Sequence, residues 1–295
     1  MERLLRAIYQ PQNVYCIHID KKSSERFHRA VRKLANCFDN VCIASQLARV
    51  MWGQFSTLLA DLNCMTDLLK HPAPWRYVIN LCGMDFPLKT NLEIVRQLKA
   101  YKNHNCIEGY IPPMKPHGYR YTSTLTHQFK PPTPHNITVY KGDTFIAATR
   151  AFVNFTMNDD VSKDFLTWLE DVHIPDEKFT SSLNRLPNAP GGSTKPSKEC
   201  NVRFRKWDHN LKFPERPKCI GIFVHRLCIF SAGYLQYLRA TPELFVNKLH
   251  YVYDPVALQC LEESLHHRTY HPEAYKQWGN FPVTNFSWIE SVDSY

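Results

Sequence analysis

The sequence predicts an α/β protein built around a largely parallel sheet, because strand-like and helix-like segments alternate along its first third. Residues 13–20 are rich in β-branched and aromatic side chains and end in Asp20. The apolar residues of 55–69 recur every three or four positions, which is typical of an amphipathic helix. A further apolar run, 75–82, stops at Gly83. Ligands of such sheets bind beyond the carboxyl ends of the strands.

Further helices and a strand complete this order. The opening residues, 1–6, have the pattern of an amphipathic helix fragment. A helix after Asp20 is expected to gather four apolar side chains on one face: Phe27, Val31, Leu34 and Phe38. A short strand at 41–44 follows that helix. Thr90 and Glu93 have the spacing of a capping box, in which hydroxyl and carboxylate satisfy each other's backbone amides, so a helix is expected to begin there.

The middle of the chain interrupts the alternation. Residues 109–136 contain six prolines, which indicate an ordered loop or an excursion over a site. A strand is predicted within 138–149, and helical periodicity continues to Val172. Residues 187–196 form a second loop.

Strands and short helices are predicted for the last third. The strands lie around 202–207 and 219–230. Thr241 and Asp254 each precede a proline, a pattern typical of helix N-termini, so two short helices are expected there. Neither an internal repeat nor a break in composition divides the chain into separate domains.

Composition and charge bound the function. The chain has 295 residues, 44% of them hydrophobic, and carries 36 Lys and Arg against 27 Asp and Glu, a net charge of +9. These are the proportions of a globular protein. The basic residues are scattered and no nucleic-acid-binding motif occurs, so we expect no nucleic-acid partner, although a basic binder remains an alternative. The apolar runs are too short to span a membrane.

Cysteines and sequons favour a secretory compartment. Ten cysteines are spread through the apolar pattern, which leaves both disulfides and buried thiols open. Asn136, Asn154 and Asn285 begin Asn-x-Ser/Thr sequons and are candidate glycosylation sites. Together these features favour an oxidising lumen, with a cytosolic protein as the alternative.

Several acids lie where strands end or loops turn: Asp20, Asp85, Glu108, Asp176 and Glu177. Such an acid can bind a ribose or a base, or act as a general base. Local sequence at 175–177 by itself favours an ordinary helix start, with Pro in the first turn and acids beside the helix dipole.

The sequence contains no phosphate-binding glycine motif and no Asp-x-Asp pair, so we predict neither a dinucleotide nor a metal site. If a pyrophosphate leaves, side-chain cations must offset its charge. The candidates are His225, Arg226 and Lys248.

A set of motifs in fixed order is similar to that of a known family. They are Asn13–Asp20, Ala60–Cys64, Ile79–Pro87, Pro175–Glu177, Lys206–Trp207, and Asp254–Pro255 with Gln259–Cys260. In this order they resemble the core 2 and I-branching β-1,6-N-acetylglucosaminyltransferases over nearly the whole chain. The resemblance implies a GT-A-like fold whose first strand precedes residue 1. It implies one catalytic domain over 1–295, with a nucleotide-binding half at 1–110 and an acceptor-binding half at 111–295. An anchor and stem upstream would hold it in the Golgi membrane, facing the lumen.

Family members transfer N-acetylglucosamine from UDP-GlcNAc to the 6-hydroxyl of a galactose or N-acetylgalactosamine in a glycan, with inversion and with neither metal nor cofactor. The resemblance implies that Glu177 is the catalytic base. It assigns donor binding to five residues: Asp20, Trp52, Lys248, His225 and Arg226. It assigns acceptor binding to four: Glu108, Lys115, Trp207 and His209.

The same resemblance implies disulfides between Cys16 and Cys64 and between Cys219 and Cys228, and a free thiol at Cys82. Two further cysteines, Cys37 and Cys260, match residues whose partners lie upstream. The remaining three have no counterpart: Cys42, Cys106 and Cys200.

Some positions depart from the family pattern. A family arginine at the diphosphate falls on His225, and Arg226 is expected to point to the opposite face of a strand. His209 replaces a tyrosine, and Lys178 begins a segment that is aromatic-rich elsewhere in the family. Since neutral histidine cannot offset a diphosphate, an alternative is a pseudoenzyme that binds glycans or a partner without turnover.

Overall fold

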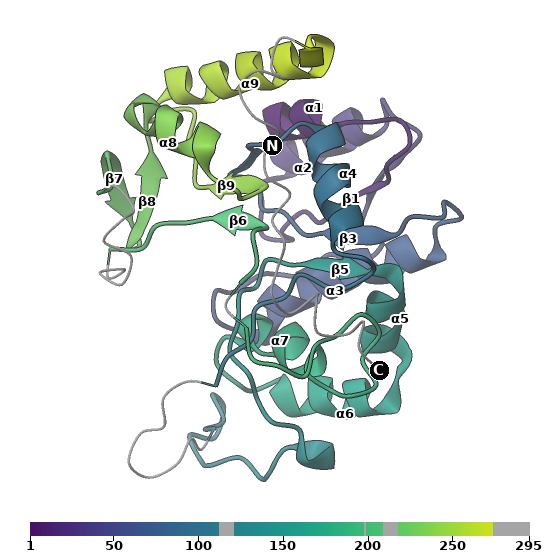
Figure 1. Cartoon of the computed structure of the whole chain (residues 1–295). Helices are drawn as coiled ribbons and strands as arrows, with labels where there is room; N and C mark the ends of the chain where they lie inside the picture. The colour runs from purple at the N-terminus through teal and green to yellow at the C-terminus, as the bar shows by residue number, and fades with distance from the viewer. Residues whose placement is uncertain (112–120, 198, 209–217, 274–295) are drawn as a thin grey trace. The chain divides into compact units, whose positions relative to one another are not determined.

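The computed structural model describes residues 1–111, 121–197, 199–208 and 218–273, and it has a mixed α/β architecture of short strands flanked by helices (Figure 1). This confirms the predicted fold class. The chain forms two compact units, each assembled from separated stretches. Among the described residues, unit 1 comprises Met1–Gln10, Leu81–Lys102 and those from 201 to 273, and unit 2 comprises Pro11–Asn80 and those from 103 to 200. The units therefore interleave along the sequence, unlike the predicted halves, and the single catalytic domain stays a prediction.

Unit 2 contains two strand pairs and most of the helices that pack on them. Its strands are β1 (Tyr15–Ile17), β2 (Val41–Ile43), β3 (Tyr77–Ile79) and β5 (Ala147–Thr149). Its helices are α2 (Glu25–Ala35), α3 (Phe55–Lys70), α5 (Arg150–Asn158), α6 (Asp160–Leu169) and α7 (Phe179–Leu183). Two 3-10 turns, η1 (Pro134–Asn136) and η2 (Pro175–Glu177), complete it.

The core of unit 2 lies between the β3–β5 pair and the helices. The strands β1 and β2 are parallel, with Tyr15 opposite Val41, whereas β3 and β5 are antiparallel. Large apolar side chains from α5, α6 and α7 fill the space on one side of β5, among them Phe152, Phe165 and Phe179. Figure 1 shows α6 and α7 together on that side. Burial of such side chains is the main force that holds these short elements together.

Unit 1 contains a three-stranded mixed sheet and a separate hairpin. Its strands are β4 (Asp85–Pro87), β6 (Arg203–Phe204), β7 (Gly221–Val224), β8 (Leu227–Phe230) and β9 (Phe245–Asn247). Its helices are α1 (Glu2–Ile8), α4 (Asn91–Ala100), α8 (Leu235–Ala240) and α9 (Pro255–Tyr270), with the 3-10 turn η3 (Ala232–Tyr234) before α8. The sheet has the order β4-β9-β6, and β7 and β8 form a separate two-stranded pair in the described part of the chain.

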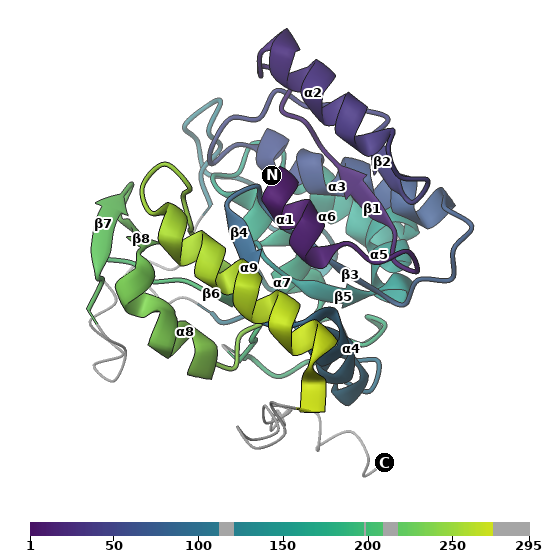
Figure 2. The same cartoon turned by 90° about the horizontal axis from the view of Figure 1, so that it is seen from above.

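Packing in unit 1 combines an apolar core with a buried ion pair. Figure 1 shows α9 crossing above α8 and α1, and Arg3 of α1 binds Glu262 of α9 at 2.6 Å; Figure 2 shows the same helix from above. Below the sheet surface, the Asp85 carboxylate lies 3.0 Å from the Arg203 guanidinium, and neither side chain is exposed to solvent. Burial raises the pKa of Asp85, although the Arg203 charge opposes that shift.

Local capping signals have the form that the sequence predicts. Thr90 and Glu93 make both hydrogen bonds of the capping box at the start of α4. Asp254 accepts a hydrogen bond from the amide of Ala257, and Pro255 occupies the first position of α9. Both predictions are confirmed. Such caps can be read from the sequence because their hydrogen bonds join residues within one helical turn.

Three expectations need correction. The sheets are not largely parallel: β1–β2 and β6–β9 are parallel, and the other described pairs are antiparallel. The helix expected at Thr241 is wrong, since Thr241 instead ends α8 and the following apolar residues form β9. Phe27 is not on the buried face of α2. That face contains His28, Val31 and Ala35, whereas Phe27 is 45% exposed. No helix in the described part of the chain is long and apolar enough to cross a membrane.

Candidate active site

Glu177 occupies a 3-10 turn that several segments of unit 2 hold in place. The turn η2 follows Ile174, whose backbone is left-handed, and begins with Pro175. The carbonyl of Glu177 accepts a hydrogen bond from the amide of Gly142 at 2.8 Å. Its carboxylate is half-buried and lies 3.2 Å from the ammonium of Lys141. The structure therefore places a lysine ammonium beside the carboxylate of the candidate base.

Glu108 lies in the segment that packs against this turn. A β-carbon on Gly142 would come within 2.1 Å of the backbone oxygen of Glu108 and 2.3 Å of the Ser181 hydroxyl. Only glycine permits that approach. Backbone hydrogen bonds in both directions between Tyr110 and Lys141 continue the contact. The structure therefore brings Glu108 and Glu177 to neighbouring segments, and their roles at an acceptor stay a prediction.

A buried arginine binds the backbone on both sides of Glu108. Arg185 donates hydrogen bonds to the carbonyls of Ile107 and Gly109, the residues on either side of Glu108, at 3.0 and 3.5 Å. Burial lowers the pKa of Arg185 to about 10. The guanidinium therefore stays charged at neutral pH and strengthens both hydrogen bonds. Nothing in the local sequence distinguishes this arginine from a surface residue, so sequence reasoning missed it.

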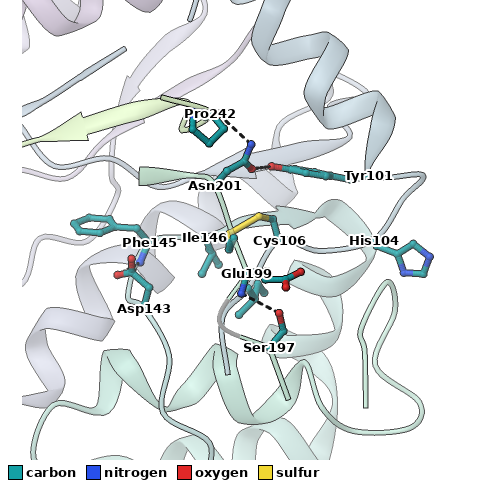
Figure 3. Close-up of a disulfide and its surroundings, with 12 residues drawn as sticks. Tyr101, His104, Cys106, Asp143, Phe145, Ile146, Ser197, Glu199, Asn201 and Pro242 are labelled. Atoms are coloured by element: carbon teal, nitrogen blue, oxygen red, sulfur yellow. Dashed lines mark hydrogen bonds between the residues drawn. A yellow bond between two sulfur atoms is a disulfide. The ribbon is translucent and has the colours of Figure 1, made fainter. Parts of the chain in front are cut away.

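A third disulfide joins Cys106 to Cys200, and Figure 3 shows this bond. Next to it, Gly109 and Ser197 exchange two backbone hydrogen bonds of 2.7 and 2.8 Å. Together these contacts hold the end of the second loop against the segment that carries Glu108. The disulfide was not predicted, because its cysteines are 94 residues apart and neither has a counterpart in the family pattern.

Asp20 lies beyond the end of β1 and is tied to the loop that carries Trp52. The carboxylate accepts hydrogen bonds from the amides of Lys22 and Val50, and the Lys22 ammonium lies 3.3 Å away. Burial opposes ionisation, but the two amides and the lysine charge outweigh it and lower the pKa of Asp20. Asp20 is therefore an ionised acceptor at neutral pH, suited to bind the N–H and O–H donors of a nucleoside.

Trp52 is a free aromatic surface at the end of that loop. Its side chain is 81% exposed, and its ring meets the ring of His173 edge-on with centroids 5.6 Å apart. The neighbouring Gly53 has a φ of +74°, and a β-carbon there would touch the His173 ring. The amide of Ile174 donates to the Gly53 carbonyl at 2.8 Å. The Trp52 loop and the Glu177 turn are thus joined through His173 and Ile174, which sequence reasoning did not single out.

The acid beside Glu177 points into the protein instead. Asp176 lines a small cavity together with Asp61, Asn80 and Thr144. Burial is the main cause that raises the pKa of Asp176, and the Glu177 carboxylate adds to the effect. One of its oxygens has no hydrogen-bond partner in the described structure. The two neighbouring acids therefore have different surroundings: Asp176 lines the cavity, whereas Glu177 pairs with the partly exposed Lys141.

Four of the described residues with a predicted donor or acceptor role belong to unit 1. Lys248 directly follows β9, and its carbonyl accepts a hydrogen bond from Phe230 at 3.0 Å. His225 and Arg226 form the exposed two-residue turn between β7 and β8, and both have positive φ angles. The expectation that they alternate along a strand is therefore wrong. Trp207 forms an isolated bridge with Leu227.

The ion pair of Arg226 limits what its charge can do. Its Nε lies 3.1 Å from the Asp208 carboxylate, and the Arg226 side chain is 67% exposed.

Asn247, next to Lys248, donates hydrogen bonds from its side-chain amide to the Asp85 carboxylate at 2.7 Å and to the sulfur of Cys82 at 3.1 Å. Two other predicted acceptor residues, Lys115 and His209, lie outside the described residues.

The remaining cysteines and sequons can be placed. The structure pairs Cys16 with Cys64 and Cys219 with Cys228, as the family pattern implies. The other four cysteines are unpaired in the described structure: Cys37, Cys42, Cys82 and Cys260. Burial raises the pKa of the Cys82 thiol.

The first two sequons differ in exposure. Asn136 and Thr138 are both exposed beside η1, whereas the sequon of Asn154 lies within α5 and its Thr156 is buried. Asn285 lies outside the described residues. Within the described ranges, no three His, Cys, Asp or Glu side chains gather as a metal site.

Comparison with known proteins identifies the family. The Core-2/I-Branching enzyme profile matches residues 1–239. The chain belongs to this family. It is 42% identical over 279 residues to human N-acetyllactosaminide beta-1,6-N-acetylglucosaminyl-transferase, an alignment that covers 90% of this chain and 68% of that protein.

Two further relatives have different printed activities. Mouse beta-1,3-galactosyl-O-glycosyl-glycoprotein beta-1,6-N-acetylglucosaminyltransferase 3 is 40% identical over 286 residues, covering 90% of this chain and 65% of that protein. A bovine herpesvirus 4 enzyme of the same printed activity is 40% identical over 285 residues, covering 90% and 64%. The chain thus spans about two thirds of the length of these curated relatives.

Proposed function

We propose that the protein transfers N-acetylglucosamine from UDP-GlcNAc to the 6-hydroxyl of a galactose or N-acetylgalactosamine in a glycan, forming a β-1,6 branch. Membership of the Core-2/I-Branching enzyme family supports this reaction. The observation that carries the assignment of the site is the half-buried Glu177 carboxylate, 3.2 Å from Lys141 and beside the segment of Glu108. A screen of glycan acceptors would identify the specific glycan.

The proposed step is a single displacement with inversion. Glu177 takes the proton of the acceptor 6-hydroxyl while the hydroxyl oxygen attacks the anomeric carbon of the donor N-acetylglucosamine. The new oxygen–carbon bond forms as the bond to the UDP phosphate oxygen breaks, so UDP leaves with the electron pair. Glu108, with Lys115, Trp207 and His209, would hold the acceptor sugar.

Donor binding is proposed for five residues. Asp20 would accept hydrogen bonds from the uridine, and Trp52 would pack on the nucleotide. Lys248, His225 and Arg226 would offset the charge of the departing diphosphate. The absence of an Asp-x-Asp pair from the sequence supports the proposal that this occurs without a metal ion. The disulfides support a location in an oxidising lumen, and we propose the Golgi.

The test is transfer from UDP-GlcNAc by the wild type and by Glu177→Gln, with Glu170→Gln on the exposed end of α6 as matched control. A general base contributes about 10²- to 10⁴-fold, so Glu177→Gln is expected to lose activity by about that factor while the control keeps it. A chelator is expected to leave the rate unchanged. Equal rates for Glu177→Gln and wild type would reject the base, and loss of activity with chelator would reject the metal-free step.

A pseudoenzyme is the second candidate, and the hairpin tip favours it. Arg226 is paired with Asp208, and the neighbouring His225 is an exposed turn residue. A protein with too little positive charge at the diphosphate would bind donor or glycan without turnover. Calorimetric binding of UDP-GlcNAc combined with the absence of product over long incubation would support this candidate over the enzyme.

A further inference from the structure

The side chain of Lys178 closes the turn that carries Glu177. Its ammonium donates hydrogen bonds to the carbonyls of His173 and Ile174, at 2.7 and 2.9 Å. These carbonyls flank the left-handed residue, Ile174, with φ of 53° and ψ of 60°. A β-branched residue rarely adopts that conformation, which is strained and persists only where the surroundings impose it. The lysine supplies a contact that holds this backbone.

The same turn connects the other parts of the site in unit 2. The amide of Ile174 binds the carbonyl of Gly53, next to Trp52, and the ring of His173 meets the Trp52 ring. After the turn, the Glu177 carbonyl receives the amide of Gly142. A change at the carbonyls that Lys178 holds would therefore move both the donor loop and the carboxylate.

We propose that Lys178 is a positioning residue that fixes the His173–Glu177 turn, and through it aims the Glu177 carboxylate and the Trp52 loop. This inference rests on the proposed function, in which Glu177 is the base. Lys178 contacts backbone carbonyls and not the reacting atoms, whereas Lys141 contacts the carboxylate itself. The two lysines thus have separate tasks.

The surroundings of the ammonium predict a pH dependence. Burial lowers the pKa of Lys178 to about 8, the Glu177 and Asp176 carboxylates oppose this, and the Lys141 charge adds to it. His173, the remaining titratable side chain of the turn, is exposed. Above pH 8 the ammonium loses its proton and its hydrogen bonds to the carbonyls lose their charge assistance. We expect kcat to fall through this range.

Stability changes in the opposite direction. Between the folded value of about 8 and the ordinary value of 10.5, the unfolded chain binds more protons at this lysine than the folded chain does. The contribution of Lys178 to the free energy of unfolding therefore rises with pH in that window. A purely structural role would make activity follow stability, so divergence of the two distinguishes a positioning role.

The experiment compares wild type, Lys178→Met and Lys178→Arg, with Lys163→Met on α6 as matched control. Lys163 lies in the same unit and makes only an exposed pair with Asp160. Lys178→Met is expected to lower kcat about 10- to 100-fold with little change in the KM for donor, because a small misplacement of a base has that cost. Lys178→Arg is expected to keep most of kcat and to lack the decline above pH 8.

Hydrogen exchange supplies a readout that does not depend on activity. The amides of Ile174 and Gly142 are expected to exchange faster in Lys178→Met and at wild-type rates in Lys163→Met. Wild-type kcat in Lys178→Met, or a loss of kcat matched by the loss of folded protein, would overturn the inference.

Glu177→Gln, assayed in parallel, separates the two proposals. If Glu177→Gln is inactive and Lys178→Met behaves as wild type, only the role of Lys178 fails. If Glu177→Gln is fully active, the proposed base fails and the positioning role falls with it.

Discussion

The turn that carries Glu177 and the hairpin tip that carries His225 and Arg226 are similar in backbone and different in surroundings. Positive φ angles occur at Ile174 in the first and at His225 and Arg226 in the second. The Glu177 turn is bonded to two segments far away in the sequence, at Gly53 and Gly142. Because those contacts are buried and long-range, the position of Glu177 depends on the packing of unit 2 as a whole.

The hairpin tip is held by its own two strands and by contacts with the segment at Trp207 and Asp208. The strands β7 and β8 pair with each other, and Cys219 and Cys228, nine residues apart, join them. All four residues of β7 are exposed. The comparison teaches that positive-φ residues can be held either by segments that are distant in the sequence or by the pairing of two adjacent strands. Substitutions should therefore have larger effects around Glu177 than at the tip.

The largest expected effect is loss of the long-range disulfide. Removing Cys106–Cys200 in a double Cys→Ala variant is expected to lower the free energy of unfolding by about 2–4 kcal/mol, more than the same change at Cys219–Cys228, because the longer loop restricts the unfolded chain more. Urea denaturation of both double variants measures this. Equal losses of unfolding free energy in the two variants would contradict the expected difference between a long-range and a local disulfide.

Next is the close approach at Gly142. Gly142→Ala places a β-carbon against the Glu108 carbonyl, so we expect a loss of about 1–3 kcal/mol in stability and about 100-fold in kcat. Gly83→Ala is the control, because a β-carbon there meets nothing within 4 Å. Thermal unfolding and transfer assays measure the two effects. Similar behaviour of the two variants would contradict the close packing of the Glu108 and Glu177 segments.

A smaller effect is expected at the hairpin tip. Arg226→Ala breaks an exposed ion pair with Asp208, which is worth about 0.2–1 kcal/mol. Asp208→Asn, which releases Arg226, is expected to lower the KM for UDP-GlcNAc a few-fold if that guanidinium serves the diphosphate. An increase in KM would show instead that the pair positions Arg226.

The smallest effect concerns Asp20. Its pKa is lowered, so its stabilising contribution is present above the ordinary value of 3.8 and is lost as the pH falls through the folded value. Because the side chain is 27% exposed, we expect about 0.2–1 kcal/mol. The difference in melting temperature between wild type and Asp20→Asn, measured from pH 7 to pH 3, should narrow with acid. A constant difference would contradict the shift.

Sequence reasoning succeeded where the signal is local. The periodicity of 55–69 predicts α3, and the spacing of Thr90 and Glu93 predicts the start of α4, because each depends on contacts within a few turns of one helix. It failed at Thr241, where a cap-like pattern ends one helix instead of beginning another. There the apolar residues that follow are more strongly stabilised as the central strand of a sheet.

The sequence by itself determined the α/β class, the family and the candidate base, since these depend on residue order and short motifs. The tertiary structure decided which groups surround that base: Lys141 on its carboxylate, Gly142 on its carbonyl, and Lys178 on the turn before it. Only it paired Cys106 with Cys200, and only it placed His173 against Trp52. The physical reason is that these contacts join residues that packing, and not local conformation, brings together.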